Sequence, residues 1–286
     1  MLCTMKKILE PAMARHFAVP AFNTSSNMIL AGVMESCEQE QAPVIIEIHP
    51  DELSFVRDSF VKSIIDEAHR TSVPVCIHLD HGASFEQAVH AIACGFTSVM
   101  IDASSRPFEE NIALTKKVVE TAHAAGVSVE AELGTIGSTG NGEEGADSII
   151  YTDPLKAEEF VEKTGVDTLA VAIGTRHGLY PASLKPELRL DLLKEIRSRV
   201  SVPLVLHGGS DNPDSEIAQA VQLGICKVNI SSDIKSAFYR KCREVLRDES
   251  LREPNAIYPP CIAAMKEVVL HKIQLFQDQD KAKYYI

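Results

Sequence analysis

The chain of 286 residues is 45% hydrophobic and 24% charged, proportions that are ordinary for a folded globular protein and exclude disordered and fibrous classes. Its formal net charge is −12 and no dense basic segment interrupts it, which excludes nucleic acid and anionic membrane surfaces as partners. An α/β barrel occupies about 250 residues in a single domain, so we expect one domain over residues 1–286.

Cysteine usage and the first residues indicate the compartment. The seven cysteines form an odd count without a CxxC pair, which argues against a disulfide framework or a zinc ribbon. Residues 1–17 carry their charges inside the apolar stretch and lack the long apolar run of a secretory signal. No apolar run reaches the about 18 residues of a membrane span. We therefore expect reduced thiols in a cytoplasmic protein.

Short apolar runs of strand length alternate along the chain with segments of helical periodicity. The predicted strands cover residues 19–22, 44–48, 75–79, 98–101, 128–133, 168–173, 204–206 and 227–230. The helices predicted after them cover residues 29–40, 59–69, 85–93, 112–124, 154–163, 191–199, 215–223 and 234–246. Two further helices are predicted at residues 5–14 and 262–276.

This alternation predicts an α/β fold, a (β/α)8 TIM barrel with an extra N-terminal helix and a C-terminal helix. A doubly wound open sheet is the alternative, but no GxGxxG motif follows the first predicted strand. A glycine-rich segment, residues 134–145, follows the fifth predicted strand, and its length and composition favour a mobile lid.

Polar side chains follow most predicted strands, at the end of the barrel where active sites of this architecture lie. His81, His177 and His207 follow the third, sixth and seventh strands. Three histidines with a fourth position open to water or substrate are typical of catalytic zinc. A structural or surface role is the alternative for any one of them alone. The other polar residues at strand ends include Asn23, Asp80, Asp102, Glu132 and Asn229.

Backbone N–H groups after the last two predicted strands form a candidate phosphate site. Loops at this place in such barrels recurrently bind phosphate, because their free N–H groups point at the anion. An ordinary turn is the alternative for the Gly-Gly-Ser sequence. The residues concerned are Gly208, Gly209, Ser210, Asn229, Ile230, Ser231 and Ser232.

A sugar phosphate beside an open metal suggests carbanion chemistry at a ketone. No lysine ends a predicted strand, so we expect a metal and not a Schiff-base lysine to be the electron sink. Asp80, next to His81, is then the candidate general acid/base, with orientation of a histidine as the alternative role. His78 lies on the same strand face one layer deeper, and we expect a hydrogen-bonded core residue there.

Five motifs occur in order along the chain: HLDHG at 78–82, EAELG at 130–134, AIGTRHGLY at 172–180, HGGS at 207–210 and KVN at 227–229. In these motifs the sequence resembles the class II, zinc-dependent ketose-bisphosphate aldolases, and within them the tagatose-bisphosphate branch. The resemblance covers essentially the whole chain.

This resemblance implies an enzyme that reversibly cleaves a ketose 1-phosphate or ketose 1,6-bisphosphate to dihydroxyacetone phosphate and an aldehyde. It implies Zn2+ on the three histidines named above and Asp80 as proton donor to the C4 hydroxyl. Asp102 and Glu132 match a second or alternate metal site, and family members assemble as homodimers or homotetramers. The positions that match the dihydroxyacetone-phosphate pocket are Gly178, Gly208, Gly209, Ser210, Asn229, Ile230, Ser231 and Ser232.

Three departures from the family pattern concern the aldehyde half of the substrate. The lid is longer and ends in Gly142-Glu143-Glu144, so either Glu143 or Glu144 is the base that removes the C3 proton. His49 stands where many relatives have Ser or Thr, and Arg176 replaces a small residue. We hypothesise an anionic aldehyde other than glyceraldehyde 3-phosphate, held by Arg176. The alternative is that Arg176 pairs with a neighbouring acidic side chain.

Two other functions remain as alternatives. A zinc metallohydrolase on the same barrel would use an HxH motif at the first strand and an aspartate at the eighth, where this chain has Phe22-Asn23 and Asn229. A non-catalytic sugar-phosphate-binding subunit should have lost a metal ligand or the acid, and this chain retains all of them.

Overall fold

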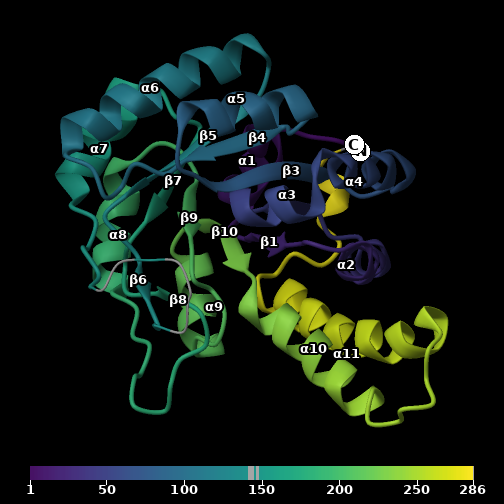
Figure 1. Cartoon of the computed structure of the whole chain (residues 1–286). Helices are drawn as coiled ribbons and strands as arrows, with labels where there is room; N and C mark the ends of the chain where they lie inside the picture. The colour runs from purple at the N-terminus through teal and green to yellow at the C-terminus, as the bar shows by residue number, and fades with distance from the viewer. Residues whose placement is uncertain (141–144, 146–147, 286) are drawn as a thin grey trace.

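Eight parallel strands close into a barrel in the computed structural model, which describes residues 1–140, 145 and 148–285 (Figure 1). In the order in which they pair around the barrel, the strands are β1 (Val19–Asn23), β10 (Ile225–Ile230), β9 (Leu204–Leu206), β7 (Thr168–Val171), β5 (Ser128–Leu133), β4 (Ser98–Ile101), β3 (Val75–Gly82) and β2 (Val44–Ile48). Pairing of β1 with β10, in which Val19 lies opposite Lys227, completes the circle. The closed order confirms the TIM barrel and excludes the doubly wound open sheet.

Helices surround the barrel because the outward residues of each strand are apolar and need cover. Ile46, Ile77 and Val129 belong to the large buried cluster between strands and helices. The helices are α1 (Met5–Arg15), α2 (Asn27–Glu40), α3 (Pro50–Val56), α4 (Asp58–Arg70), α5 (Phe85–Cys94), α6 (Phe108–Ala124), α7 (Pro154–Thr164), α8 (Leu190–Arg199), α9 (Asp214–Gln222), α10 (Ser232–Val245) and α11 (Pro254–Leu275), with a short 3-10 turn η1 (Ala282–Tyr284). None of the described helices is long and apolar enough to cross a membrane.

The predicted N-terminal helix closes one end of the barrel. Met5 and Leu9 of α1 form a second buried cluster with Val19, Ile45 and Cys76, which point inward from β1, β2 and β3. Because these residues occupy the amino-terminal end of the strands, the opposite end remains available for a site.

Two helices differ from the sequence prediction. Residues 50–56 form α3, which was not predicted, and α11 begins at Pro254 instead of residue 262. The proline pair Pro259-Pro260 conceals the start of α11, but Tyr258 stacks on Phe238 of α10 with ring centroids 6.1 Å apart. Packing of this kind outweighs the local propensity of the prolines.

Outside the barrel, β6 (Gly137–Ser138) and β8 (Arg176–His177) form a small two-stranded sheet. Gly137 pairs with Arg176, and Ser138 pairs with His177. The start of the glycine-rich segment is therefore hydrogen-bonded to the segment that carries one of the three histidines.

Candidate active site

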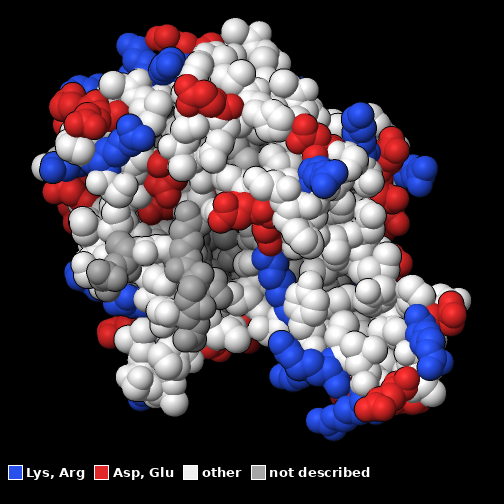
Figure 2. Space-filling model, viewed as in Figure 1, with Lys and Arg blue, Asp and Glu red and all other residues white. Residues whose placement is uncertain are grey.

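A cavity of about 250 Å³ opens at the carboxyl ends of the barrel strands. Figure 2 shows the surface hollowed at this place, with acidic and basic side chains next to each other at its edge. Its lining contains many of the residues predicted from the sequence, and also Asp51, Glu52 and Lys235, which were not predicted. The complete lining is Asn23, His49, Asp51, Glu52, Asp80, His81, His177, Gly178, Gly208, Ser210, Asn229, Ser231, Ser232 and Lys235.

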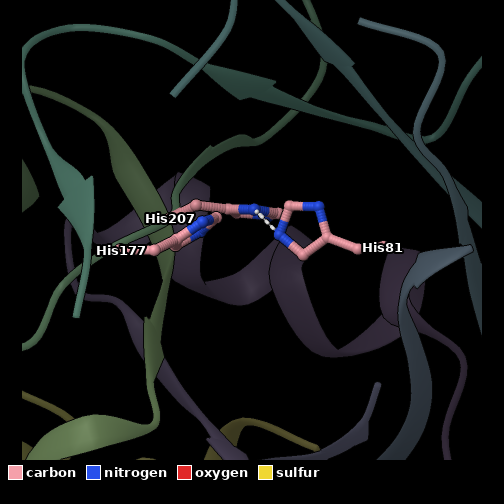
Figure 3. A group of neighbouring side chains, drawn as sticks. All are labelled: His81, His177 and His207. Atoms are coloured by element: carbon pink, nitrogen blue, oxygen red, sulfur yellow. Dashed lines mark hydrogen bonds between the residues drawn. The ribbon is translucent and has the colours of Figure 1, made fainter. Parts of the chain in front are cut away.

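The three predicted histidines converge from different elements. His81 lies in β3, His177 in β8, and His207 directly after β9. Their rings face one another (Figure 3), and one ring nitrogen of each belongs to a group of ligand atoms that all lie within 4.8 Å. The His81 ring centroid is 4.6 Å from that of His207 and 5.0 Å from that of His177.

A local irregularity in β3 turns His81 toward the others. Neighbouring residues of a regular strand point to opposite faces, yet Asp80 and His81 both line the cavity. His81 has a positive φ of 46°, and the pairing of β3 with β4 shifts register between Leu79 and Gly82. Such a backbone is strained for a residue other than glycine. A side chain at position 82 would also place its Cβ 2.5 Å from the Met100 carbonyl oxygen, which explains the glycine there.

Carboxylates fix the rings of two of the histidines. His81 Nδ1 donates to Asp102 Oδ2 at 2.9 Å, and His207 Nε2 donates to Glu130 Oε1 at 2.8 Å. Burial acts to raise the pKa of both carboxyl groups, but His81 beside Asp102 and Lys227 beside Glu130 hold each pKa below its usual range. Ionised carboxylates only accept, so the nitrogens that face them carry the protons.

This arrangement leaves the unprotonated nitrogens of the two rings facing each other. His81 Nε2 lies 2.9 Å from His207 Nδ1, the contact drawn in Figure 3. Burial lowers the pKa of His207, which disfavours a second proton on its ring between the two facing nitrogens. Histidines that donate one nitrogen to a carboxylate and direct the other at a common point are typical of metal ligands. The donor set therefore fits a zinc-type ion.

Glu132 and Asp102 are two carboxylates that lie near His81. Glu132 Oε1 accepts from the Ile136 N–H at 3.3 Å, whereas Glu132 Oε2 is buried without a hydrogen-bond partner, 3.6 Å from His207 Nδ1. Burial, together with the nearby Asp102, raises the pKa of Glu132. His81, Asp102 and Glu132 form a second group of ligand atoms within 4.8 Å. The unpartnered oxygen fits a second or alternate cation position.

Asp80 is held by two amides. Asn23 Nδ2 donates to Asp80 Oδ2 at 2.9 Å, and Asn229 Nδ2 donates to Asp80 Oδ1 at 3.1 Å. Burial acts to raise the pKa of Asp80, but the adjacent histidines and the Asn23 amide hold the pKa well below its usual range. We call Asp80, His81, Glu132 and His207 the upper layer of the barrel interior.

A lower layer, defined as Glu47, His78, Glu130 and Lys227, lies beneath it. Lys227 Nζ donates to both oxygens of Glu130, at 3.0 and 3.1 Å, and lies 3.3 Å from Glu47 Oε2. All four side chains are fully buried. Burial lowers the pKa of His78 to about 3 and raises that of Glu47. His78 Nδ1 bonds Ser98 Oγ at 2.9 Å, which confirms the predicted core role.

The predicted phosphate-binding residues follow β8 and β9 and join β10 to α10. Ser231 is the N-cap of α10 and its side chain makes no capping hydrogen bond, while Asp233 N donates to Ser210 Oγ. Gly208 has a φ of 63°, and a Cβ there would lie 2.5 Å from the Arg176 carbonyl oxygen. Gly178, Gly208, Ser210, Ser231 and Ser232 line the cavity, whereas Gly209 and Ile230 do not.

Arg176 does not line the described cavity. Its guanidinium donates from Nη1 to the Ser138 carbonyl oxygen at 3.2 Å and packs against Gly137. No hydrogen bond or ion pair within the described part of the chain joins Arg176 to an acidic side chain. His49 does line the cavity, and its Nδ1 accepts from Asp51 N as the N-cap of α3. Glu143 and Glu144 lie outside the described residues.

The unpredicted cavity residues form an ion pair at the rim. Lys235 Nζ lies 2.5 Å from Glu52 Oε1, and Asp51 is beside them. Glu52 is the third residue of α3, where it completes a capping box with His49. The sequence His-Pro-Asp-Glu carries this signal, and Lys235 lies one helical turn after the serines at the start of α10.

Comparisons with known proteins agree with this geometry. The sequence matches the family model described as Fructose-bisphosphate aldolase class-II over residues 3–281. It is 41% identical over 290 residues to the fructose-bisphosphate aldolase of Staphylococcus epidermidis, with 99% of each chain covered. It is 40% identical to that of Geobacillus stearothermophilus, over 98% of this chain and 99% of that protein. The solved YdjI aldolase of Escherichia coli K12 superposes with a TM-score of 0.86 at 37% identity, over 99% of this chain and 100% of that chain.

Proposed function

Because this chain belongs to the class II fructose-bisphosphate aldolase family, a family of lyases, we propose that it cleaves a ketose 1-phosphate or ketose 1,6-bisphosphate reversibly to dihydroxyacetone phosphate and an aldehyde. Family membership sets aside the metallohydrolase. The non-catalytic subunit is disfavoured, since Asp80 and the three histidines all line one cavity.

The facing nitrogens of His81 and His207 carry the proposal, since they need a cation between them. We propose zinc at this point, with His177 as third ligand, and a second or alternate position at Asp102 and Glu132. When bound, the metal polarises the ketone carbonyl and stabilises the negative charge that develops as the carbon–carbon bond breaks. The hydrogen bonds from His81 to Asp102 and from His207 to Glu130 hold the two rings in the required tautomers.

Asp80 is the proposed proton carrier for the C4 hydroxyl. In cleavage the hydroxyl gives up its proton as the bond between C3 and C4 breaks, and in the reverse direction the aldehyde oxygen receives a proton. The amides of Asn23 and Asn229 fix the orientation of the Asp80 carboxylate, which lines the cavity. Glu143 or Glu144 is the proposed base for the C3 proton.

The phosphate of the dihydroxyacetone half is assigned to the wall formed by Gly178, Gly208, Ser210, Ser231 and Ser232. The uncapped start of α10 offers backbone N–H groups and the positive end of the helix dipole. Lys235 lies in the first turn of this helix and adds a cation. The aldehyde half is assigned to the side of His49, because Arg176 does not line the cavity.

Cleavage assays test the proposal directly. Purified protein is supplied with fructose 1,6-bisphosphate or its C4 epimer tagatose 1,6-bisphosphate, and release of dihydroxyacetone phosphate is followed with and without a strong chelator. We expect chelator-sensitive cleavage of at least one epimer, restored by zinc, and no borohydride-trapped adduct. Cleavage that persists in metal-free protein, or a trapped lysine adduct, would exclude the metal-based mechanism.

The remaining expectations concern the protein as a whole. We propose a single domain, a homodimer or homotetramer, and a cytoplasmic location for a protein that acts on phosphorylated sugars. Light scattering of the purified chain distinguishes the oligomers from a monomer of 31.3 kDa.

A further inference from the structure

Another group of possible metal ligands, Asp58, His90 and Cys94, lies on the outer surface of the barrel. Asp58 Oδ1 lies 3.0 Å from His90 Nε2, and Cys94 Sγ lies 3.5 Å from the same nitrogen. One ligand atom from each of the three side chains lies within 4.8 Å of the others. None of the three residues lines the cavity of the proposed active site.

Two adjoining helices supply these residues. His90 and Cys94 are four residues apart in α5, so their side chains lie on one face of that helix. Asp58 is the first residue of α4. It follows Arg57, whose φ of 64° and ψ of 167° place it in a region that residues other than glycine rarely occupy. A strained backbone thus holds Asp58 beside the helical pair.

The spacing matches the requirements of a tetrahedral ion. Nitrogen, oxygen and sulfur ligands at about 2.0 to 2.3 Å from one zinc lie about 3.3 to 3.8 Å from one another. The distances of 3.0 and 3.5 Å around His90 Nε2 lie close to this range. About half of the side-chain surface of both Asp58 and His90 is exposed, at 54% each, so small adjustments meet little resistance.

We propose that Asp58, His90 and Cys94 bind a divalent ion of the zinc class on the protein surface, separate from both active-site positions. Imidazole and thiolate ligands select zinc-class ions over magnesium or calcium. On binding, the Cys94 thiol releases its proton to solvent and the sulfur becomes the ligand. The carboxylate and the thiolate then balance the two positive charges of the ion, and the neutral imidazole completes a three-ligand site.

A neighbouring cavity gives the fourth ligand a place. Asp58 and His90 both line a cavity of about 660 Å³ between α3, α4 and the start of α5. Leu53 and Leu79 contribute apolar surface to it, and Gln87 contributes an amide. Water or a small solute in this cavity can therefore complete the coordination. The ion would also link α4 to α5.

Cobalt distinguishes the proposed site from the active site. Thiolate coordination gives Co2+ an intense charge-transfer band in the near ultraviolet, which ligands of nitrogen and oxygen alone do not give. The active-site group contains no cysteine. Cys94 is also the one cysteine of the seven that is not buried. A charge-transfer band in Co2+-loaded protein thus reports on this surface site alone.

The experiment uses metal-stripped full-length protein titrated with Co2+. We expect the band in the wild type and also in His81→Gln, whose active-site metal binding is impaired. Cys94→Ser should lose the band and should bind about one ion per chain fewer than the wild type. His90→Gln should weaken the affinity at this site at least about tenfold, since loss of an outer-sphere partner alone costs about 10- to 100-fold.

His271→Gln serves as the matched control. His271 pairs with Asp214 at 2.9 Å with exposures of 51% and 52%, close to those of His90 and Asp58, but no cysteine accompanies this pair in the metal-ligand groups of the described residues. The control should keep the full band. Absence of the band in the wild type, or its survival in Cys94→Ser, overturns the proposal. That result would leave the proposed aldolase activity and the proposed active-site metal standing, because they depend on other residues.

Discussion

The upper and lower layers of the barrel interior contain similar side chains but differ in their source of positive charge. In the lower layer, Lys227 lies within 3.3 Å of both Glu47 and Glu130. In the upper layer, the described hydrogen-bond and ion-pair partners of Asp80 and Glu132 are amides, backbone N–H groups and histidines, with no lysine or arginine.

This difference makes the upper layer the better suited of the two to bind a metal, although Glu47, His78 and Asp80 also form a group of ligand atoms within 4.8 Å. Buried carboxylates require a cation, because the desolvation of an unpaired charge is expensive. The lower layer supplies its own cation on β10, which lies within ion-pair distance of both of its carboxylates. The upper layer leaves facing nitrogens and an unpartnered oxygen, and an ion from solution satisfies both. His78, close to Lys227, thus serves as a core residue, whereas His81 and His207 are placed to bind a metal.

Removal of a ligand from the upper layer should have the largest effect. His81→Ala takes away the histidine that faces both partners, and a metal supplies several kcal/mol of transition-state stabilisation. We expect kcat/KM to fall by about a thousandfold or more, with loss of bound zinc measured by elemental analysis. His123→Ala, on the exposed face of α6, is the control and should keep full activity. Unchanged activity in His81→Ala would contradict the assignment of the upper layer.

Asp80→Ala separates proton transfer from metal binding within the same layer. We expect kcat to fall about 10²- to 10⁴-fold while zinc remains bound, because the three histidines are intact. Steady-state kinetics and metal content of the same preparation decide the matter. If zinc is lost as well, Asp80 serves to orient His81, which is 3.8 Å away.

Lys227→Met tests the lower layer through stability. It leaves the Glu130 carboxylate buried without its counter-charge, and we expect the free energy of unfolding to fall by about 3 to 5 kcal/mol. Urea denaturation of metal-free protein measures this change. Lys163→Met removes an exposed pair with Glu159 in α7 and should leave the free energy of unfolding almost unchanged. Equal effects of the two substitutions would show that the lower layer is not held together by Lys227.

Arg176→Ala should have the smallest effect. Because the guanidinium contacts the Ser138 carbonyl oxygen rather than the described cavity, we expect kcat/KM to change less than about threefold, and equally with neutral and anionic aldehydes. Condensation assays with matched aldehydes measure this. A loss confined to the anionic aldehyde would instead support the role of Arg176 in aldehyde recognition. It would also extend the substrate site beyond the described cavity.

Much of this arrangement is predictable from the sequence, because strand alternation fixes the barrel and the carboxyl ends of strands fix the site. His81, His177 and His207 each follow a predicted strand, and the structure brings them together. Lys227 begins the eighth predicted strand, at the end opposite to the candidate site. The sequence could not show that its long side chain reaches Glu130 across the barrel, because that contact joins β10 to β5, two strands that do not pair.

Side-chain direction outside regular strands was also unpredictable. Arg176 precedes His177, but its direction depends on pairing with Gly137 in the small sheet, which no local pattern signals. The surface group was overlooked for a related reason. His90 lies within a predicted helix and its partner Asp58 comes from a different helix, so the two meet only in the folded chain.

Closure of the barrel has a consequence for the order of folding. The first strand pairs with the last, so the circle cannot form until β10 has been synthesised. Long-range pairing of this kind slows folding. The same strand delivers Lys227, and therefore a nascent chain that lacks β10 holds Glu47 and Glu130 without their counter-charge. Water must remain around these carboxylates until β10 pairs with its neighbours. Removal of water from the interior and completion of the barrel therefore occur together.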